Sequence, residues 1–159
     1  MVVSADRTDP PSPERLTRNW SELLQELRVV QTGVQILTGF LLTVPFSSRF
    51  EDLAGSQKAV YLVVLSGSVL TTGFVVAPVA FHRLLFRHHM RGWLVEAANR
   101  SAVVGLALLA LTSAGVVYLV FDVVWCTPAA LVALGIALAF FAVVWVVVPR
   151  LAGAGRWLR

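Results

Sequence analysis

The sequence has little charge and a single cysteine. Charged residues make up 14% of its 159 residues, whereas roughly 25% is usual in a soluble domain, and hydrophobic residues make up 57%. Because Cys126 is alone, an intramolecular disulfide and a cysteine-based metal site within one chain are excluded. The shortage of charge and the excess of apolar residues predict an integral membrane protein.

The motifs of the common enzyme and cofactor sites are also missing. The sequence contains no glycine-rich phosphate loop, no Ser–His–Asp arrangement and no zinc signature. His82 and His89 would share one face of a helix, but they have no third ligand, and Arg83 and Arg87 beside them disfavour a bound cation. We therefore expect neither an enzyme nor a protein with a cofactor or a metal.

The basic character of the chain does not require nucleic acid as a partner. Its formal net charge is +4 and its pI is near 10.2. Most of the basic residues flank apolar stretches, where they orient a membrane protein and contact anionic headgroups. The N-terminus has no apolar stretch after a basic one and so does not resemble a cleavable signal peptide. The expected partners are the lipid bilayer and anionic lipids at its cytoplasmic face, and not nucleic acid.

Long, almost uncharged stretches predict four membrane-spanning helices. They cover about residues 27–46, 59–81, 101–122 and 129–148, each close to the roughly 20 residues that cross a ~30 Å hydrocarbon core. The predicted fold class is all-α, an integral membrane four-helix bundle within a domain of residues 15–149. A basic cytoplasmic loop, residues 82–100, joins the second span to the third. The proline-rich residues 1–14 are expected to form a disordered tail, and residues 150–159 a second, short tail.

The distribution of Lys and Arg predicts the orientation of these spans. Eleven of the 13 lie in the N-terminal segment, the 82–100 loop and the C-terminal tail, whereas only Arg49 and Lys58 lie on the other side. An excess of Lys and Arg marks the cytoplasmic side of a membrane protein. We expect a multi-pass protein of the plasma membrane with both termini in the cytoplasm.

The first span carries polar side chains into the membrane. At about 100° per residue, Arg28, Gln31, Gln35 and Thr38 share one face of this helix, within a sector of about 80°. Glu26 lies close to the opposite face. Because glutamines that face lipid are costly, we expect the glutamine face to point into the bundle.

Further polar side chains lie at the depth of Gln35 and Thr38 in the second and third spans. They are Thr71, Thr72, Thr112 and Ser113. One interpretation is hydrogen bonding between helices, worth about 0.6 kcal/mol for each bond on average. The other is a narrow polar path for water, protons or a small solute, which usually also needs an ionisable group at depth.

No carboxylate occupies the middle of a span. Exchange of sodium for protons is most simply run by a carboxylate near the midplane that trades one ion for the other. Glu26 lies at the inner end of the first span, Asp122 at the outer end of the third, and Glu96 in the basic loop. Glu26 is the best candidate for a coupling acid, and its alternative role is a solvated ion pair at the interface.

The basic loop contains a regular row of arginines. Arg83, Arg87 and Arg91 recur every four residues, so on a helix they form one ridge next to apolar and aromatic residues that can dip into the interface. This pattern predicts contact with anionic lipids.

Two segments resemble a family of small four-span bacterial membrane proteins of unknown function, found mainly in actinobacteria. The segments are "ELRVVQTGVQILTGFLLTVPF" and "APVAFHRLLFRHH". In the first, the matching residues are Glu26, Leu27, Arg28, Gln31, Gly33, Gln35, Gly39, Phe40, Leu41, Leu42, Pro45 and Phe46. In the second, they are Ala77, Pro78, His82, Arg83, Leu85 and Phe86. The resemblance implies the four-span architecture, and some members of the family are named sodium:proton antiporters.

The sequence therefore favours a non-enzymatic component of the plasma membrane that acts as a homo-oligomer or with a membrane partner, because four short helices enclose little interior. The alternative is a small secondary transporter of the sodium/proton antiporter type. It would use Gln31 and Gln35, with Glu26 as the coupling acid.

Overall fold

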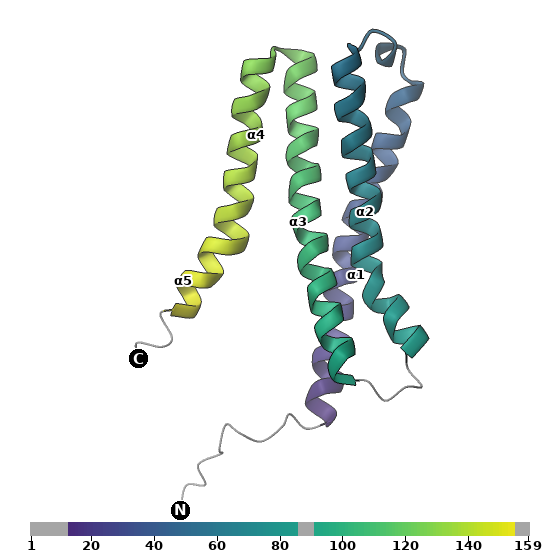
Figure 1. Ribbon diagram of the computed structural model, residues 1–159, viewed down its shortest axis with the longest axis vertical. Helices are drawn as coiled ribbons and strands as arrows, with labels where there is room; N and C mark the ends of the chain where they lie inside the picture. The colour runs from purple at the N-terminus through teal and green to yellow at the C-terminus, as the bar shows by residue number, and fades with distance from the viewer. Residues whose placement is uncertain (1–12, 86–90, 155–159) are drawn as a thin grey trace, which may run out of the picture.

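The computed structural model describes residues 13–85 and 91–154, which form long helices and no strand (Figure 1). The first three helices are α1 (Pro13–Thr43), α2 (Gly55–Leu85) and α3 (Arg91–Val124). The fourth is a continuous rod made of α4 (Thr127–Ala142), a π-helical segment (Val143–Val147) and α5 (Val148–Ala154). Two 3₁₀ turns, Val44–Phe46 and Ser48–Phe50, lead from α1 toward α2.

Each of these four helices is long and apolar enough to cross a membrane. The candidate spans are Leu27–Phe46, Gly55–Phe81, Glu96–Val124 and Thr127–Gly153. The predicted all-α class with four membrane helices is confirmed. The segment expected to be a loop, residues 82–100, is largely helical instead, because α2 continues to Leu85 and α3 already begins at Arg91.

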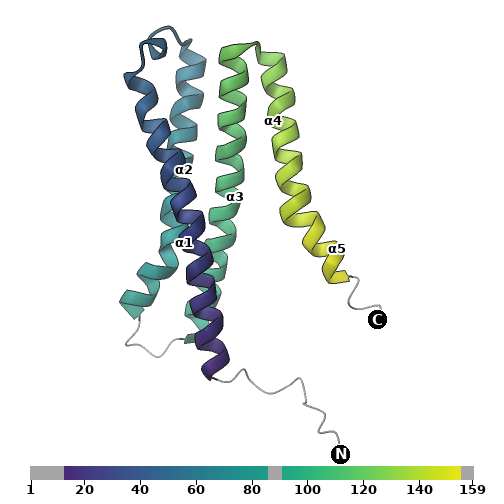
Figure 2. The ribbon, with the colours of Figure 1, turned by 180° about the vertical axis from the view of Figure 1, so that it is seen from behind.

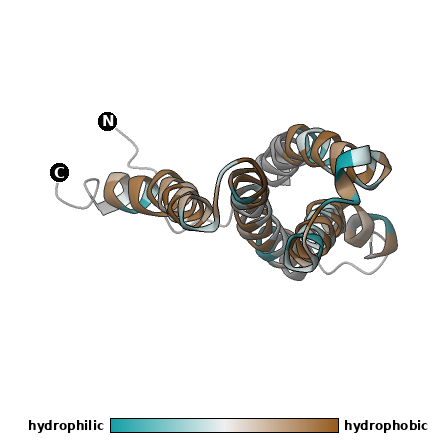
Figure 3. Ribbon diagram, turned by 90° about the horizontal axis from the view of Figure 1, so that it is seen from above, coloured by the Kyte–Doolittle hydropathy of each residue, from teal (hydrophilic) through white to brown (hydrophobic). Residues whose placement is uncertain are grey.

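Neighbouring helices run antiparallel, but the fourth helix stands apart from the other three. Seen from above, α1, α2 and α3 group together, and α4 lies beside α3 alone (Figure 3). Among the described residues α2 and α3 share the most extensive contact, α1 lies mainly against α2, and α4 packs against α3 but not against α1 or α2. The described chain begins and ends at the same end of the molecule, as an even number of spans requires (Figure 2).

The contact between α1 and α2 follows a seven-residue repeat. Leu27, Val34 and Leu41 are buried and lie seven residues apart, so they form one seam along α1. At the C-terminal end of this seam, Leu41 joins a core cluster that includes Tyr61 of α2. The Tyr61 hydroxyl donates a hydrogen bond of 2.9 Å to the carbonyl oxygen of Leu41. This carbonyl belongs to the last turn of α1, where backbone acceptors lack intrahelical donors, so Tyr61 caps the helix end.

Glycines bring α2 and α3 close together. A Cβ atom on Gly67 of α2 would lie 2.7 Å from Oγ1 of Thr112 in α3. In the reverse direction, a Cβ atom on Gly115 of α3 would lie 2.7 Å from Cγ2 of Val64 in α2. Each glycine thus receives a side chain of the facing helix, which is how small residues let membrane helices approach.

Two of the helices depart from regular α geometry. Pro78 is buried inside α2, and the helix continues beyond it, with its final turns leaning away from the other helices (Figure 1). Proline removes one backbone hydrogen bond and so allows a helix to bend at this place. In the fourth helix, Val143–Val147 widen to a π-helical turn, also a local weakening of the α-helical ladder.

The close α2–α3 contact predicts that Gly115→Ala lowers the free energy of unfolding by about 1–3 kcal/mol, because the new methyl group meets Val64. The matched control is Gly135→Ala in α4, where an added Cβ meets nothing within 4 Å. Titration of the protein with SDS in detergent micelles, followed by circular dichroism, measures both variants. Equal stability of the two would contradict the close contact.

Candidate functional site

Hydroxyl groups of α1 and α2 meet near the middle of the membrane-spanning region. Thr38 Oγ1 of α1 lies 2.7 Å from Ser68 Oγ of α2, and either hydroxyl can be the donor. Thr38 Oγ1 also donates to the carbonyl oxygen of Val34 at 2.8 Å. Because the hydroxyl proton of Thr38 is used in the hydrogen bond to Val34, the Ser68 hydroxyl donates its own proton to Thr38 Oγ1. Ser68 is fully buried, so this hydrogen bond is shielded from both water and lipid.

The remaining hydroxyls of α2 bond to their own helix. Thr71 Oγ1 donates to the carbonyl oxygen of Gly67 at 2.8 Å, and Thr72 Oγ1 donates to that of Ser68 at 3.1 Å. Thr112 of α3 is 4% exposed, and its Oγ1 faces Gly67 across the α2–α3 contact. These hydroxyls lie in the tightly packed part of the fold, where they contribute contacts between helices.

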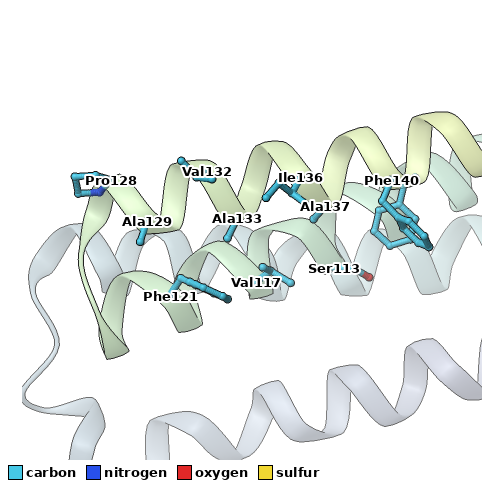
Figure 4. Close-up of a pocket in the computed structure, with 11 residues that line it drawn as sticks. Ser113, Val117, Phe121, Pro128, Ala129, Val132, Ala133, Ile136, Ala137 and Phe140 are labelled. Atoms are coloured by element: carbon cyan, nitrogen blue, oxygen red, sulfur yellow. The ribbon is translucent and has the colours of Figure 1, made fainter.

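Ser113 does not belong to this group, although it follows Thr112 in the sequence. Adjacent residues of a helix point about 100° apart, so when Thr112 faces α2 its neighbour must turn aside. Ser113 faces α4 and lines an open groove of about 800 Å³ between α3 and α4 (Figure 4). The other walls are almost wholly apolar, with Val117 and Phe121 from α3 and Val132 and Ile136 from α4.

The predicted polar face of α1 is also divided. Thr38 is the member that bonds to another helix, Gln31 is half-buried, and both Arg28 and Gln35 are exposed. The expectation that this face points into the bundle is therefore wrong for Gln35 within a single chain. Gln35 is exposed because the seam of Leu27, Val34 and Leu41 sets the rotation of α1 and leaves Gln35 at the edge of the contact with α2.

The glutamate and arginine candidates of the described helices lie toward the end of the molecule at which α1 begins. The side chain of Glu26 is outside what the structure describes, and so is that of Arg91, the first residue of α3. Arg87 lies outside the described residues altogether, whereas Arg83 is exposed near the end of α2. Glu96, expected in a loop, is part of α3 and pairs with Arg100 one turn further on.

The sequence analysis did not predict a polar cluster at the opposite end of the helices, where α3 turns into α4. Asp122 of α3 accepts a hydrogen bond from Gln57 Nε2 of α2 at 3.0 Å and another from Thr127 Oγ1 of α4 at 2.6 Å. One carboxylate thus connects three helices at the side where α3 turns into α4. The sequence did contain a signal for this cluster, because all three residues lie at the ends of spans that meet on the same side.

Ligand sets for a metal do not assemble in the part of the chain that the structure describes. Within residues 13–85 and 91–154, no three side chains of His, Cys, Asp or Glu come together as a group that could hold an ion.

The sequence of residues 10–149 matches a family of unknown function, DUF6328. This match confirms the resemblance to a family of unknown function noted from the two sequence segments. No curated protein and no solved structure matches the chain. The family match covers all four candidate membrane helices except the end of the last one.

The bond between α1 and α2 can be tested by a double-mutant cycle of Thr38→Val and Ser68→Ala. We expect the two losses of unfolding free energy to be coupled by about 0.6 kcal/mol, with an upper limit near 1.7, because each variant removes the same hydrogen bond. Titration with SDS gives the four stabilities. The control cycle pairs Ser68→Ala with Thr32→Val, whose hydroxyl bonds only to Arg28 of its own helix. Additive losses in the first cycle would argue against the Thr38–Ser68 bond.

Proposed function

The chain belongs to the DUF6328 family, and we propose that it is a non-enzymatic component of the membrane that acts as an oligomer or with another membrane protein. The observation that carries this proposal is the incomplete closure of the bundle. Among the described elements α4 has α3 as its only neighbouring span, and an open groove of about 800 Å³ separates part of the two. A chain built in this way offers more helix surface to its surroundings than to itself.

Membrane physics favours using such surfaces for association. Lipid tails are as apolar as the side chains of α4, so hydrophobic burial does not drive a loose helix back onto the bundle. Packing and hydrogen bonding must hold helices together instead. The chain concentrates both in α1–α3, through the Gly67 and Gly115 contacts and the Thr38–Ser68 bond. The outer faces of α1 and α4 are therefore the surfaces that remain for a partner.

A small secondary transporter of the sodium/proton antiporter type is the alternative function. It would need Gln31, Gln35 and the coupling acid Glu26 to line one path with the buried hydroxyls. The described side chains favour association over this alternative, because Gln35 points away from Thr71 and Thr112. Those two residues are instead packed between α2 and α3.

We further propose that both termini lie in the cytoplasm of a bacterium and that the helices cross its plasma membrane. The support is the excess of Lys and Arg at the end where the described chain begins and ends. At the other end the chain has only Arg49 and Lys58.

The proposal predicts that the protein leaves the membrane as a complex. Extracted into native nanodiscs with a styrene–maleic acid copolymer, it should have a protein mass larger than that of one 17.3 kDa chain. Mass photometry or native mass spectrometry measures this mass. Particles that contain a single chain and no other protein would overturn the proposal.

Reconstitution of the purified protein into proteoliposomes distinguishes association from transport. In proteoliposomes with an imposed pH gradient, we expect sodium to cause no dissipation beyond that of protein-free liposomes. A sodium-dependent dissipation that Glu26→Gln abolishes would instead establish the antiporter alternative.

We propose that the arginine ridge of Arg83, Arg87 and Arg91 contacts anionic lipids. In support, Arg83 is exposed near the inner end of α2. Neutralising all three to glutamine should remove the stabilisation that phosphatidylglycerol gives to the detergent-solubilised protein, and 0.5 M salt should weaken it in the unmodified protein. Thermal unfolding with and without added lipid measures the effect. The control is Arg49→Gln at the outer end. Unchanged stabilisation in the triple variant would refute the contact.

A further inference from the structure

The side chain of Gln35 occupies an unusual environment for an amide. The first span runs from Leu27 to Phe46, so at about 1.5 Å per residue Gln35 lies about 2 Å from the middle of this span. It is exposed, and it has no hydrogen-bond partner in the part of the chain that the structure describes. Hydrocarbon offers neither donors nor acceptors, so an amide at this depth needs a protein partner.

Gln35 lies in a strip of polar and small residues along α1, which we call the α1 outer strip. Its members are Arg28, Thr32, Gln35, Gly39 and Thr43. They fall within an arc of about 80°. Ile36 borders this arc, Phe40 lies about 100° from its middle, and the buried seam begins about 80° beyond its other edge. All five are exposed.

Two other members of the strip are already hydrogen-bonded within α1, and a third is a glycine that leaves space for a second helix. Thr32 and Thr43 donate to carbonyl oxygens of α1 itself, at 3.0 and 2.7 Å. Gly39 lies one turn from Gln35, and a Cβ atom there would meet nothing within 4 Å. Gln35 is thus the member that lacks a partner, and Gly39 allows a second helix to approach it closely.

The rest of the chain is poorly suited to supply the missing partner. Between residues 129 and 148, the indole of Trp145 is the one polar group on the side chains of the fourth helix, and that helix packs against α3. The hydroxyls of Thr38, Thr71 and Thr72 are already hydrogen-bonded within α1 and α2. Gln35 thus has no partner among the described residues, and a polar group of another molecule would satisfy its amide.

A second copy of this chain has the required chemistry at the required depth. Copies inserted in the same orientation can pair about a twofold axis along the membrane normal, and such a pairing brings identical residues to the same depth. A primary amide both donates and accepts, so two Gln35 side chains can satisfy each other. Arg28 lies about 13 Å from the middle of the span, near the headgroups, where two like charges remain solvated.

We propose that the α1 outer strip binds the same strip of a second copy in a parallel dimer, with the two Gln35 amides hydrogen-bonded across the twofold axis. The inference rests on the proposed function and names its partner and its surface. It is independent of the groove between α3 and α4.

Cysteine crosslinking tests this geometry, because the chain has one native cysteine that can be removed as Cys126→Ser. In that background Thr32→Cys and Gly39→Cys place a thiol on the strip on either side of Gln35. Gly33→Cys and Phe40→Cys, two exposed positions about 100–120° from the middle of the strip, are the matched controls. Oxidation in native membranes with copper phenanthroline should give a disulfide-linked dimer at the strip positions and little at the control positions.

The role of the amide is tested with Gln35→Leu, which keeps a side chain of similar size without its polar group. In liposomes of increasing lipid-to-protein ratio, single-molecule photobleaching measures dimerisation. Loss of the interhelical bond should weaken dimerisation by about 3- to 20-fold, the fold-change that corresponds to the measured range for such bonds in membranes. The control is Phe40→Leu, an exposed position about 100° from the middle of the strip.

The outcomes separate this inference from the broader proposal. A complex in native nanodiscs whose cysteines crosslink equally on both sides of α1, or not at all, would overturn the α1 dimer and leave association intact. Crosslinks from the strip to a different protein would likewise overturn it. Single chains in the nanodiscs would overturn both, and unchanged dimerisation of Gln35→Leu would remove the amide from the interface.

Discussion

Hydrocarbon cannot form hydrogen bonds, and this constraint governs where every polar side chain of the spans is placed. Several hydroxyls form hydrogen bonds within their own helix, as Thr71 and Thr72 do by donating to carbonyls of α2. Thr38 and Ser68 form a hydrogen bond with each other between α1 and α2. Asp122 and Gln57 form another at the outer end, where hydrogen bonds also reach Thr127. A glutamine is harder to accommodate, because its amide cannot be satisfied by one acceptor.

The same constraint explains why three helices pack tightly and the fourth does not. Without hydrophobic burial to drive association, helices in lipid depend on close backbone approach and hydrogen bonds. Gly67 and Gly115 provide the first for α2 and α3, and Ser68 provides the second for α1 and α2. Gly135 of α4 has no neighbour within 4 Å of its Cβ position. The contact of α4 with α3 therefore relies on apolar packing and the Asp122–Thr127 bond at one end.

The sequence predicted the number and the approximate position of the helices, because long uncharged stretches report directly on the hydrocarbon core. It also placed Thr38 at the depth of Thr71 and Thr72, but the hydroxyl that Thr38 meets is Ser68, one turn earlier in α2, and the two threonines bond to their own helix. Rotation about the helix axis was harder to predict. Thr112 and Ser113 share a depth but face different helices, and the seven-residue spacing of Leu27, Val34 and Leu41 would have indicated the buried side of α1. The extension of α2 to Leu85 and of α3 back to Arg91, both within residues 82–100, has no hydropathy signal, because helices outside the hydrocarbon core need no apolar side chains.

The two open surfaces of the chain differ in what can cover them. The groove between α3 and α4 is lined by apolar side chains apart from Ser113, whose single hydroxyl can bond within its own helix. An apolar helix of a partner can cover such a groove by packing alone, without any hydrogen bond. The α1 outer strip contains an amide at the middle of the span, and acyl chains cannot satisfy it. The groove beside α4 is thus suited to apolar packing, and the strip on α1 also requires a hydrogen-bonding partner, which is why α1 is the more informative helix for the association of this protein.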